Sequence, residues 1–126
     1  MFDVDHFKDI NDQHGHTAGD RKLISIVKRC QDNIRAGDRF IRWGGEEFVV
    51  LLQNTRLQEA EVIAEKLRRS LDEGNWADDI PVTASFGVAT SSASDTATTL
   101  LQRADLAVYR AKQGGRNLVR VESALA

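Results

Sequence analysis

The sequence predicts a single α+β domain whose elements follow the order β-α-α-β-β-α-β-α-β. Three stretches carry apolar residues at helical spacing, which indicates amphipathic helices. Between them lie short runs of β-branched and aromatic residues, which indicate strands. Two of these runs flank Gly44-Gly45, a pattern typical of a tight β-hairpin. The 126 residues are enough for one domain that buries its own core.

The first third of the chain is predicted to form the end of a strand and two helices. Met1 to Asp5 alternates apolar and acidic residues, as a strand end does. A short helix over Phe7–His14 is expected to end at Gly15, and a longer helix is expected over Thr17–Ile34. The apolar stripe of the longer helix consists of Leu23, Ile24, Ile26, Val27, Cys30 and Ile34.

The hairpin that follows carries two adjacent acids at its tip. Phe40–Trp43 and Phe48–Leu52 would join through Gly44-Gly45 in a type I′ or II′ turn, which needs the positive φ that glycine adopts freely. A turn does not require Glu46 and Glu47, whose like charges cost stability. One interpretation is a solvated turn with incidental acids. The other is a site where bare glycine backbone approaches a phosphate or base, while the acids supply hard oxygen ligands for Mg²⁺.

The rest of the chain is predicted to form two helices and two strands. The helices are expected over Leu57–Leu71 and in the segment that ends at Gly114-Gly115, and the strands over Val82–Thr90 and Leu118–Val121. Asn54-Thr55 would cap the first of these helices, and Asp95 or Thr96 would start the second. The central Gly87 weakens the longer strand.

Composition narrows the class of protein. A net charge of −2, with 41% hydrophobic and 29% charged residues, suits a globular domain and gives no general attraction to nucleic acid or anionic membrane. The sequence contains no run of about 18 apolar residues, so it predicts no membrane-spanning helix. Cys30 is the only cysteine, so no internal disulfide can form and a reducing compartment fits. Its place in an apolar helix stripe predicts a core residue rather than a nucleophile.

Four blocks along the chain resemble the motifs of the GGDEF family of diguanylate cyclases. The hairpin heptapeptide, Arg42 to Phe48, resembles the family signature in its Glu-Glu variant. The other blocks match in order and spacing, and they are Asp3-Val4-Asp5-His6-Phe7-Lys8, then Asn11-Asp12 with Gly15-His16 and Gly19-Asp20, and Ala111-Lys112-Gln113-Gly114-Gly115-Arg116-Asn117. A chance match of all four over nearly the whole chain is remote.

The resemblance implies a five-stranded mixed sheet, largely antiparallel and flanked by helices, like the palm-type catalytic core of nucleotidyl cyclases. It also implies that residues 1–126 are one GGDEF-type catalytic domain truncated at its N-terminus. The family's usual preceding helix, its Thr-Gly-Leu motif and the first half of the first strand are missing. Asp3 would then lie at a chain terminus, where structure frays.

The resemblance also implies a metal site beside the hairpin. It assigns the Asp3 carboxylate, the Val4 carbonyl, Glu46 and Glu47 to Mg²⁺ or Mn²⁺, and one glutamate helps to deprotonate a 3′-hydroxyl. From the residues alone, Asp3 and the hairpin acids converge only if their strands are neighbours. A regular strand would aim only one of Glu46 and Glu47 inward, because successive residues face opposite sides. Asp5 is expected to be an ordinary acid at a strand end.

Two helix ends are candidates for binding a triphosphate. Phe7 and Lys8 begin a helix directly after the first strand, where free N–H groups and the helix dipole favour phosphate. By resemblance, this backbone and Lys8 bind the β- and γ-phosphates, and Lys112 and Arg116 also bind the triphosphate. Without the resemblance, Lys8 is better interpreted as a solvated lysine. Basic residues at a helix C-terminus are favoured by the dipole anyway.

Asn11 and Asp20 are the candidates for a guanine base. Guanine presents N1–H and N2–H₂ as neighbouring donors that one carboxylate can accept, and asparagine can pair with a ring acceptor and the amino group. Adenine lacks that donor pair. Without the resemblance, Asp20 would be an acid at a helix start. Gly44 and Gly45 would let the substrate approach the backbone.

Arg35 and Asp38 match the family's Arg-x-x-Asp inhibitory site in residue type and in distance from Gly44. Arginine pairs with phosphate and stacks on guanine, while aspartate accepts from the guanine edge. The alternative is a local salt bridge in a turn. A second arginine usually completes such a site, and Arg68 or Arg69 is the candidate.

Two functions follow from the resemblance. The first is a diguanylate cyclase that condenses two GTP into cyclic di-GMP with release of pyrophosphate, acts only as a homodimer and is inhibited by its product. The truncated chain itself could lack that activity. The alternative is a non-catalytic module that senses GTP or cyclic di-GMP. The resemblance further implies a cytoplasmic domain behind a sensor or receiver domain of its parent protein, with no nucleic-acid or membrane contact of its own.

Overall fold

The computed structural model describes residues 1–122, and their elements follow the predicted order. The elements are β1 (Phe2–Val4), α1 (Phe7–His14), α2 (His16–Gln31), β2 (Arg39–Arg42), β3 (Glu47–Leu51), α3 (Leu57–Asp72), β4 (Ala84–Ala89), α4 (Ala97–Gln113) and β5 (Val119–Glu122). The five strands form one sheet in the order β2-β3-β1-β4-β5. Only the β4–β5 pair is parallel. The predicted α+β fold with a mixed, largely antiparallel sheet is confirmed.

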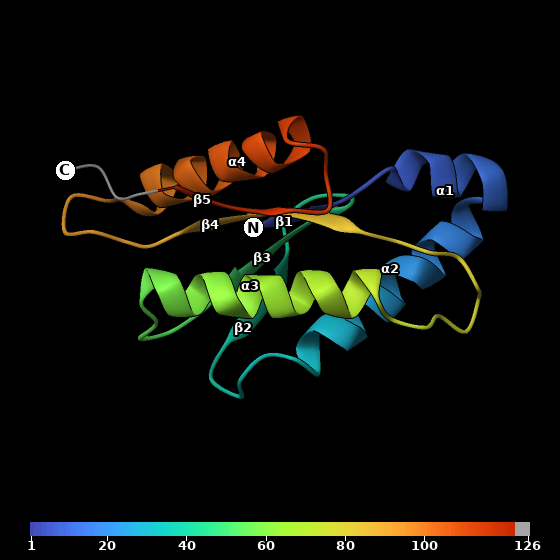
Figure 1. Cartoon of the computed structure of the whole chain (residues 1–126), viewed down its shortest axis with the longest axis horizontal. Coiled ribbons are helices and arrows are strands. Elements are labelled where there is room, and N and C mark those ends of the chain that lie inside the picture. The colour runs from blue at the N-terminus through green and yellow to red at the C-terminus, as the bar shows by residue number, and fades with distance from the viewer. Residues whose placement is uncertain (123–126) are drawn as a thin grey trace.

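The helices cover both faces of the sheet (Figure 1). α4 runs along one face, α2 and α3 lie against the other, and α1 extends beyond the end of the sheet. Within residues 1–122, no helix is both long and apolar enough to cross a lipid bilayer.

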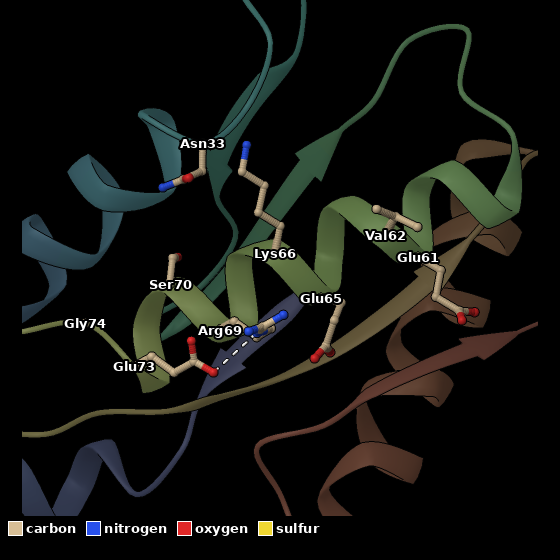
Figure 2. Close-up of a pocket in the computed structure, with 9 residues that line it drawn as sticks. All are labelled: Asn33, Glu61, Val62, Glu65, Lys66, Arg69, Ser70, Glu73 and Gly74. Atoms are coloured by element: carbon tan, nitrogen blue, oxygen red, sulfur yellow. Dashed lines mark hydrogen bonds and ion pairs between the residues drawn. The ribbon is translucent and has the colours of Figure 1, made fainter.

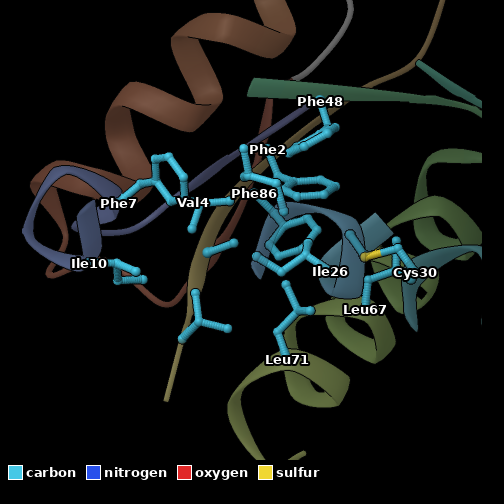
Figure 3. Close-up of a cluster of buried hydrophobic side chains, with 14 residues drawn as sticks. Phe2, Val4, Phe7, Ile10, Ile26, Cys30, Phe48, Leu67, Leu71 and Phe86 are labelled. Carbon is cyan, nitrogen blue, oxygen red and sulfur yellow. The ribbon is translucent and has the colours of Figure 1, made fainter. Parts of the chain in front are cut away.

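A row of phenylalanines fixes the register of the three central strands. Phe2 of β1 pairs with Phe48 of β3 and with Phe86 of β4, and its ring centroid lies 5.1 Å and 4.7 Å from theirs. Figure 3 shows these rings packed against side chains from α2 and α3, including Ile26 and Leu67. β1 is therefore the central strand of the sheet, and this burial holds it between two partners.

The first residue is bonded to β4 through both of its backbone groups. The Met1 carbonyl accepts from the Gly87 N–H at 2.8 Å, and the Met1 amine donates to the Gly87 carbonyl at 2.9 Å. Cys30 is confirmed as a core residue, since it is fully buried and its burial raises the pKa of the thiol to about 12.

The hairpin forms as predicted, but its turn does not. Among the described glycines, only Gly15 and Gly115 adopt positive φ, so Gly44 and Gly45 do not make a type I′ or II′ turn. Instead, the N–H groups of Trp43 and Gly44 both donate to the Glu47 carbonyl, at 2.8 Å and 3.1 Å. The strands are therefore joined by a wider turn in which glycine is not needed for its backbone angles.

The two predicted helix caps have different outcomes. Thr96 caps α4 through a reciprocal capping box with Thr99, as expected. The cap predicted at Asn54-Thr55 is wrong, because α3 begins after Arg56 with no side-chain cap. Asn54 is left-handed, with φ 49°, and the Thr55 hydroxyl donates to the Gln53 carbonyl instead.

Gly87 lies in β4 where the backbone of α4 packs closely on the sheet. A Cβ at this position would lie 2.3 Å from the Ala104 carbonyl oxygen, 2.5 Å from the Val108 nitrogen and 2.9 Å from the Ala107 Cβ. The missing side chain therefore lets the backbone of α4 pack directly on β4.

We expect Gly87→Ala to destabilise the domain by about 1–3 kcal/mol, because helix backbone cannot yield without shifting α4. Thermal unfolding followed by circular dichroism measures the loss. Gly37→Ala is the matched control, since its φ is not left-handed and its Cβ would meet only a Gln53 side-chain oxygen, at 3.8 Å. A Gly87→Ala protein that melts with the wild type would contradict the close packing of α4.

Candidate functional site

The sheet face opposite the phenylalanine row carries the predicted acids. Asp3 pairs with Glu47 of β3 on one side and with Ser85 of β4 on the other. The Val4 N–H donates to the Glu46 carbonyl at 3.1 Å, so the second glutamate also lies beside β1. The strands are thus neighbours, and the register brings Asp3, Val4 and both glutamates together. Glu47 lies within β3 and Glu46 precedes it.

The charge around Glu47 is predominantly negative. Lys112 of α4 reaches the sheet and donates to Asp3 Oδ2 at 2.6 Å, and the Asp3 side chain is only 9% exposed. Burial, followed by the charges of Asp3 and Asp105, raises the pKa of Glu47, and Lys112 offsets this only in part. Sequence reasoning missed Asp105, which belongs to no matched motif and reaches this site only through the packing of α4.

The donor chemistry of this cluster fits a hard divalent cation. Asp3 and Glu47 offer carboxylate oxygens from paired strands, which are the kind of ligand that Mg²⁺ prefers. In the part of the chain that the structure describes, no three acidic, histidine or cysteine side chains converge tightly enough to hold a metal ion. The Lys112 ammonium pairs with Asp3 in this arrangement.

Arg42 bonds the turn that leads into the two glutamates, and sequence reasoning missed this role. Its Nη2 donates to the Gly45 carbonyl at 2.7 Å, and its Nε lies 3.2 Å from the carbonyl oxygens of both Gly44 and Gly45. A Cβ on Gly45 would meet nothing within 4 Å. Neither the backbone angle nor the packing of this protein therefore requires glycine at position 45.

The start of α1 is open to an anion. His6, which precedes the helix, is left-handed with φ 54°, and no side chain caps the first turn. The buried Phe7 anchors the helix, whereas Lys8 is exposed. Because α1 follows β1 by two residues, its N-terminal N–H groups lie close to the end of the strand that carries Asp3.

Asn11 and the segment before Asp20 meet where α1 packs on α2. A Cβ on Gly19 would lie 1.8 Å from Asn11 Oδ1, so the glycine makes room for this side chain. Asn11 Oδ1 is buried and has no hydrogen-bond partner among residues 1–122, while the neighbouring Asp20 is exposed. An unsatisfied buried acceptor beside an exposed carboxylate is suited to a ligand with several donors.

The two predicted basic residues at the end of α4 differ in their contacts. Lys112 joins the acidic cluster, whereas Arg116 is exposed in the turn that follows. Asp5 lies beneath this turn and is not the ordinary strand-end acid that was expected. It is 5% exposed and accepts from the Thr83 and Ser85 hydroxyls at 2.7 Å and 2.6 Å.

Arg35 and Asp38 form an ion pair at 3.1 Å in the turn before β2. Burial alone would raise the pKa of Asp38, but hydrogen bonds from the Arg35 side chain and backbone hold that pKa below its usual value. Half of the Arg35 side chain is exposed, whereas the Asp38 side chain is only 2% exposed. The Arg35 Nη2 also donates to the Gln53 carbonyl at 3.3 Å and to the Thr55 hydroxyl. The candidate second arginines bond elsewhere, Arg68 to Glu65 and Asn117, and Arg69 to Glu73.

A hollow of about 620 Å³ opens along α3 near the end of α2 (Figure 2). Its lining includes Asn33, Lys66 and Arg69, and Figure 2 shows Arg69 paired with Glu73 along the helix. None of the residues in the acidic cluster lines it, so this hollow is separate from the candidate active site.

Comparison with known families agrees with this geometry. Residues 1–118 match the family described as diguanylate cyclase, GGDEF domain. Diguanylate cyclase A of Treponema denticola is 42% identical over 123 residues, and the response regulator PleD of Caulobacter vibrioides is 43% identical over 125 residues. Both alignments cover 94% of this chain but only 33% and 28% of those proteins. The chain thus spans about a third of their length.

Solved structures share the fold. The active GGEEF domain of a diguanylate cyclase from Vibrio cholerae has a TM-score of 0.90 at 32% identity, over 98% of this chain and 81% of that one. The GGDEF domain of DgcB from Caulobacter crescentus, solved in complex with c-di-GMP, has a TM-score of 0.89 at 27% identity, over 95% and 74% of the two chains. The chain therefore belongs to the GGDEF domain family of diguanylate cyclases.

Proposed function

We propose that this domain condenses two GTP into cyclic di-GMP and two pyrophosphates, with two copies of the domain facing each other. The observation that carries the proposal is the pairing of Asp3 with Glu47 on the central strands, directly beside the open N-terminus of α1. The buried, unpartnered acceptor of Asn11 next to Asp20 supports guanine as the base.

The reaction requires each 3′-hydroxyl to attack the α-phosphorus of the GTP held by the facing domain. A new bond forms between O3′ and phosphorus, the bond from the α-phosphorus to the bridging oxygen breaks, and pyrophosphate leaves. We assign the hydroxyl proton to Glu46 or Glu47. The raised pKa of Glu47 favours it as the proton acceptor, because a carboxylate of higher pKa is the stronger base.

The chain's own residues would orient the substrate for this attack. The first N–H groups of α1, with Lys8 and Arg116, would bind the triphosphate, and Gly44 and Gly45 would let it approach the backbone. Lys112, which pairs with Asp3, would exchange this partner for a phosphate when GTP binds.

A divalent cation fits the same oxygens. Asp3, the Val4 carbonyl, Glu46 and Glu47 would hold Mg²⁺ or Mn²⁺, which when bound neutralises phosphate oxygens and makes the 3′-hydroxyl more acidic. The pairing of Asp3 with Glu47 on neighbouring strands supports this assignment, since a cation would neutralise two carboxylates that lie side by side.

The wider assembly is also part of the proposal. The chain spans about a third of relatives such as PleD, a response regulator, so we infer a receiver or sensor domain upstream in a cytoplasmic region of the parent protein. One GTP binds each domain, so catalysis requires a homodimer. The half-exposed Arg35 and its partner Asp38 would bind cyclic di-GMP and inhibit the enzyme. DgcB, a similar protein solved with c-di-GMP, supports a product-binding role.

Two variants should separate synthesis from product binding. Glu47→Gln is expected to lower cyclic di-GMP formation by about 100-fold or more, because it removes a proton acceptor and a metal ligand, and to leave product affinity unchanged. Arg35→Ala should weaken the binding of cyclic di-GMP and leave its formation at low product concentration unchanged. Chromatography of the products and titration calorimetry with cyclic di-GMP measure the two properties. A wild-type protein that binds cyclic di-GMP but makes none would favour the sensor module.

Glu47→Gln is also expected to raise the melting temperature near pH 8. Burial and nearby carboxylates raise the pKa of Glu47 above its ordinary 4.5, so the folded protein holds this proton more tightly than the unfolded chain. Stability linked to this group is full below pH 4.5 and is lost as the pH rises through the raised pKa. The increase in melting temperature of Glu47→Gln over the wild type should therefore disappear below pH 4.5. Glu61→Gln, at an exposed position, is the control, and a Glu47→Gln protein less stable than wild type at pH 8 would contradict the charge balance.

A further inference from the structure

We propose that Asp5, Asn117 and Arg68 act as positioning residues that hold the turn between α4 and β5 in the shape that binds the triphosphate. The proposal rests on the proposed function, because it assigns a task to the turn that carries Lys112 and Arg116. Arg68 of α3 lies in no matched motif. Asp5 and Asn117 lie within matched motifs, but the resemblance assigns neither of them a role at the phosphates.

The turn has an unusual backbone. Gly115, Arg116 and Asn117 follow one another with φ of 119°, 64° and 50°. Left-handed backbone is readily adopted by glycine but is unfavourable for residues with a Cβ. Two such residues in succession persist only when surrounding contacts over-determine them, and strain of this kind gathers at functional sites.

Asp5 holds the backbone of the turn. One of its oxygens, Oδ2, accepts from the Asn117 N–H at 3.0 Å and from the Thr83 hydroxyl at 2.7 Å. The other oxygen accepts from the Ser85 hydroxyl at 2.6 Å. The carboxylate is therefore fixed from the β4 side and is aimed at the turn. Because Asp5 follows Asp3 by two residues, it ties the turn to the strand that carries the acidic cluster.

Arg68 holds the side chain of the same residue. Its Nη1 donates to Asn117 Oδ1 at 2.8 Å, across 49 positions of sequence. Its other nitrogens donate to the two Glu65 oxygens at 2.9 Å and 2.6 Å, and Asp72 lies 3.6 Å from it. The side chain is 16% exposed. Two carboxylates of α3, Glu65 and Asp72, thus orient the guanidinium that bonds Asn117.

These contacts would prepare the turn for the ligand. Lys112 lies before the strained residues and Arg116 lies among them, and the Arg116 N–H closes the helix end by donating to the Ala111 carbonyl at 3.0 Å. A turn that is already ordered loses less conformational entropy when the phosphates bind. Releasing Asn117 should therefore weaken binding of the triphosphate and spare binding of the base, which lies at α1 and α2.

Arg68→Ala, with Arg69→Ala as the matched control, tests this in the full chain. Arg69 is the next residue along α3, and it pairs only with Glu73 at the surface among the described contacts. We expect Arg68→Ala to weaken binding of a non-hydrolysable GTP analogue with Mg²⁺ by about tenfold. Guanosine affinity, read by NMR titration, should be unchanged, and Arg69→Ala should match the wild type for both ligands.

Substitutions of Asn117 provide a second measurement. Asn117→Gly removes the Arg68 contact but tolerates left-handed φ, so it should weaken triphosphate binding less than Asn117→Ala does. In the absence of nucleotide, Arg68→Ala should also speed hydrogen exchange of the Asn117 amide relative to Arg69→Ala.

The outcomes separate this proposal from the proposed function. A wild-type protein that does not bind the GTP analogue overturns the proposed function. If the wild type binds it and Arg68→Ala behaves like Arg69→Ala, the positioning role is overturned alone. Equal losses of guanosine and triphosphate binding in Arg68→Ala would also overturn it, because they indicate general loosening of the fold.

Discussion

The candidate site depends on the pairing register of β1 with its two neighbours. The phenylalanine row places Phe2 between Phe48 and Phe86, and burial against α2 and α3 fixes that face of the sheet. Because strand residues alternate, Asp3 and Glu47 must then face α4. A slip by one residue would bury carboxylates among aromatic rings, which is far more costly than leaving them in water. Core packing therefore determines which acids meet.

The basic half of the site depends on the close approach of α4. Gly87 lets the helix backbone rest on β4, and this brings Lys112 onto Asp3 across 109 positions of sequence. The turn after α4 then returns the chain to β5 beside β4, with Asn117 bonded to Asp5. Helix α4 and the turn after it thus bring Lys112 and Asn117 to Asp3 and Asp5, which lie more than 100 positions earlier in the sequence.

Sequence patterns predicted most of this architecture, because apolar periodicity and glycine positions are local signals. The predicted α1 has the observed bounds, and α3 begins at Leu57 as expected. The GGDEF resemblance predicted which acids form the site and that the sheet is mixed and largely antiparallel. The turn at Gly44-Gly45 was mispredicted because an arginine, Arg42, bonds its carbonyls, and composition alone does not report that contact.

Other features could not be predicted because their partners are remote in sequence. Asp5 bonds to residues 78 and 112 positions away, so its buried role has no local signature. Arg68 is a candidate for the inhibitory site on its residue type, but in the structure its guanidinium donates to Asn117, 49 positions away in sequence. The Arg35–Asp38 pair is compatible with both the local and the inhibitory interpretation, since the Arg35 side chain is half exposed while the Asp38 side chain is buried against it.

The most direct test of the central claim is the rate of cyclic di-GMP formation from GTP and Mg²⁺ per chain, measured over a wide range of protein concentration. Each domain holds one GTP in this account, so two domains must meet for each product. The rate per chain should be nearly zero at nanomolar protein and should rise as the chains associate, with two pyrophosphates released for each cyclic di-GMP. A rate per chain that is independent of concentration, or GTP turnover without cyclic di-GMP, would contradict the account.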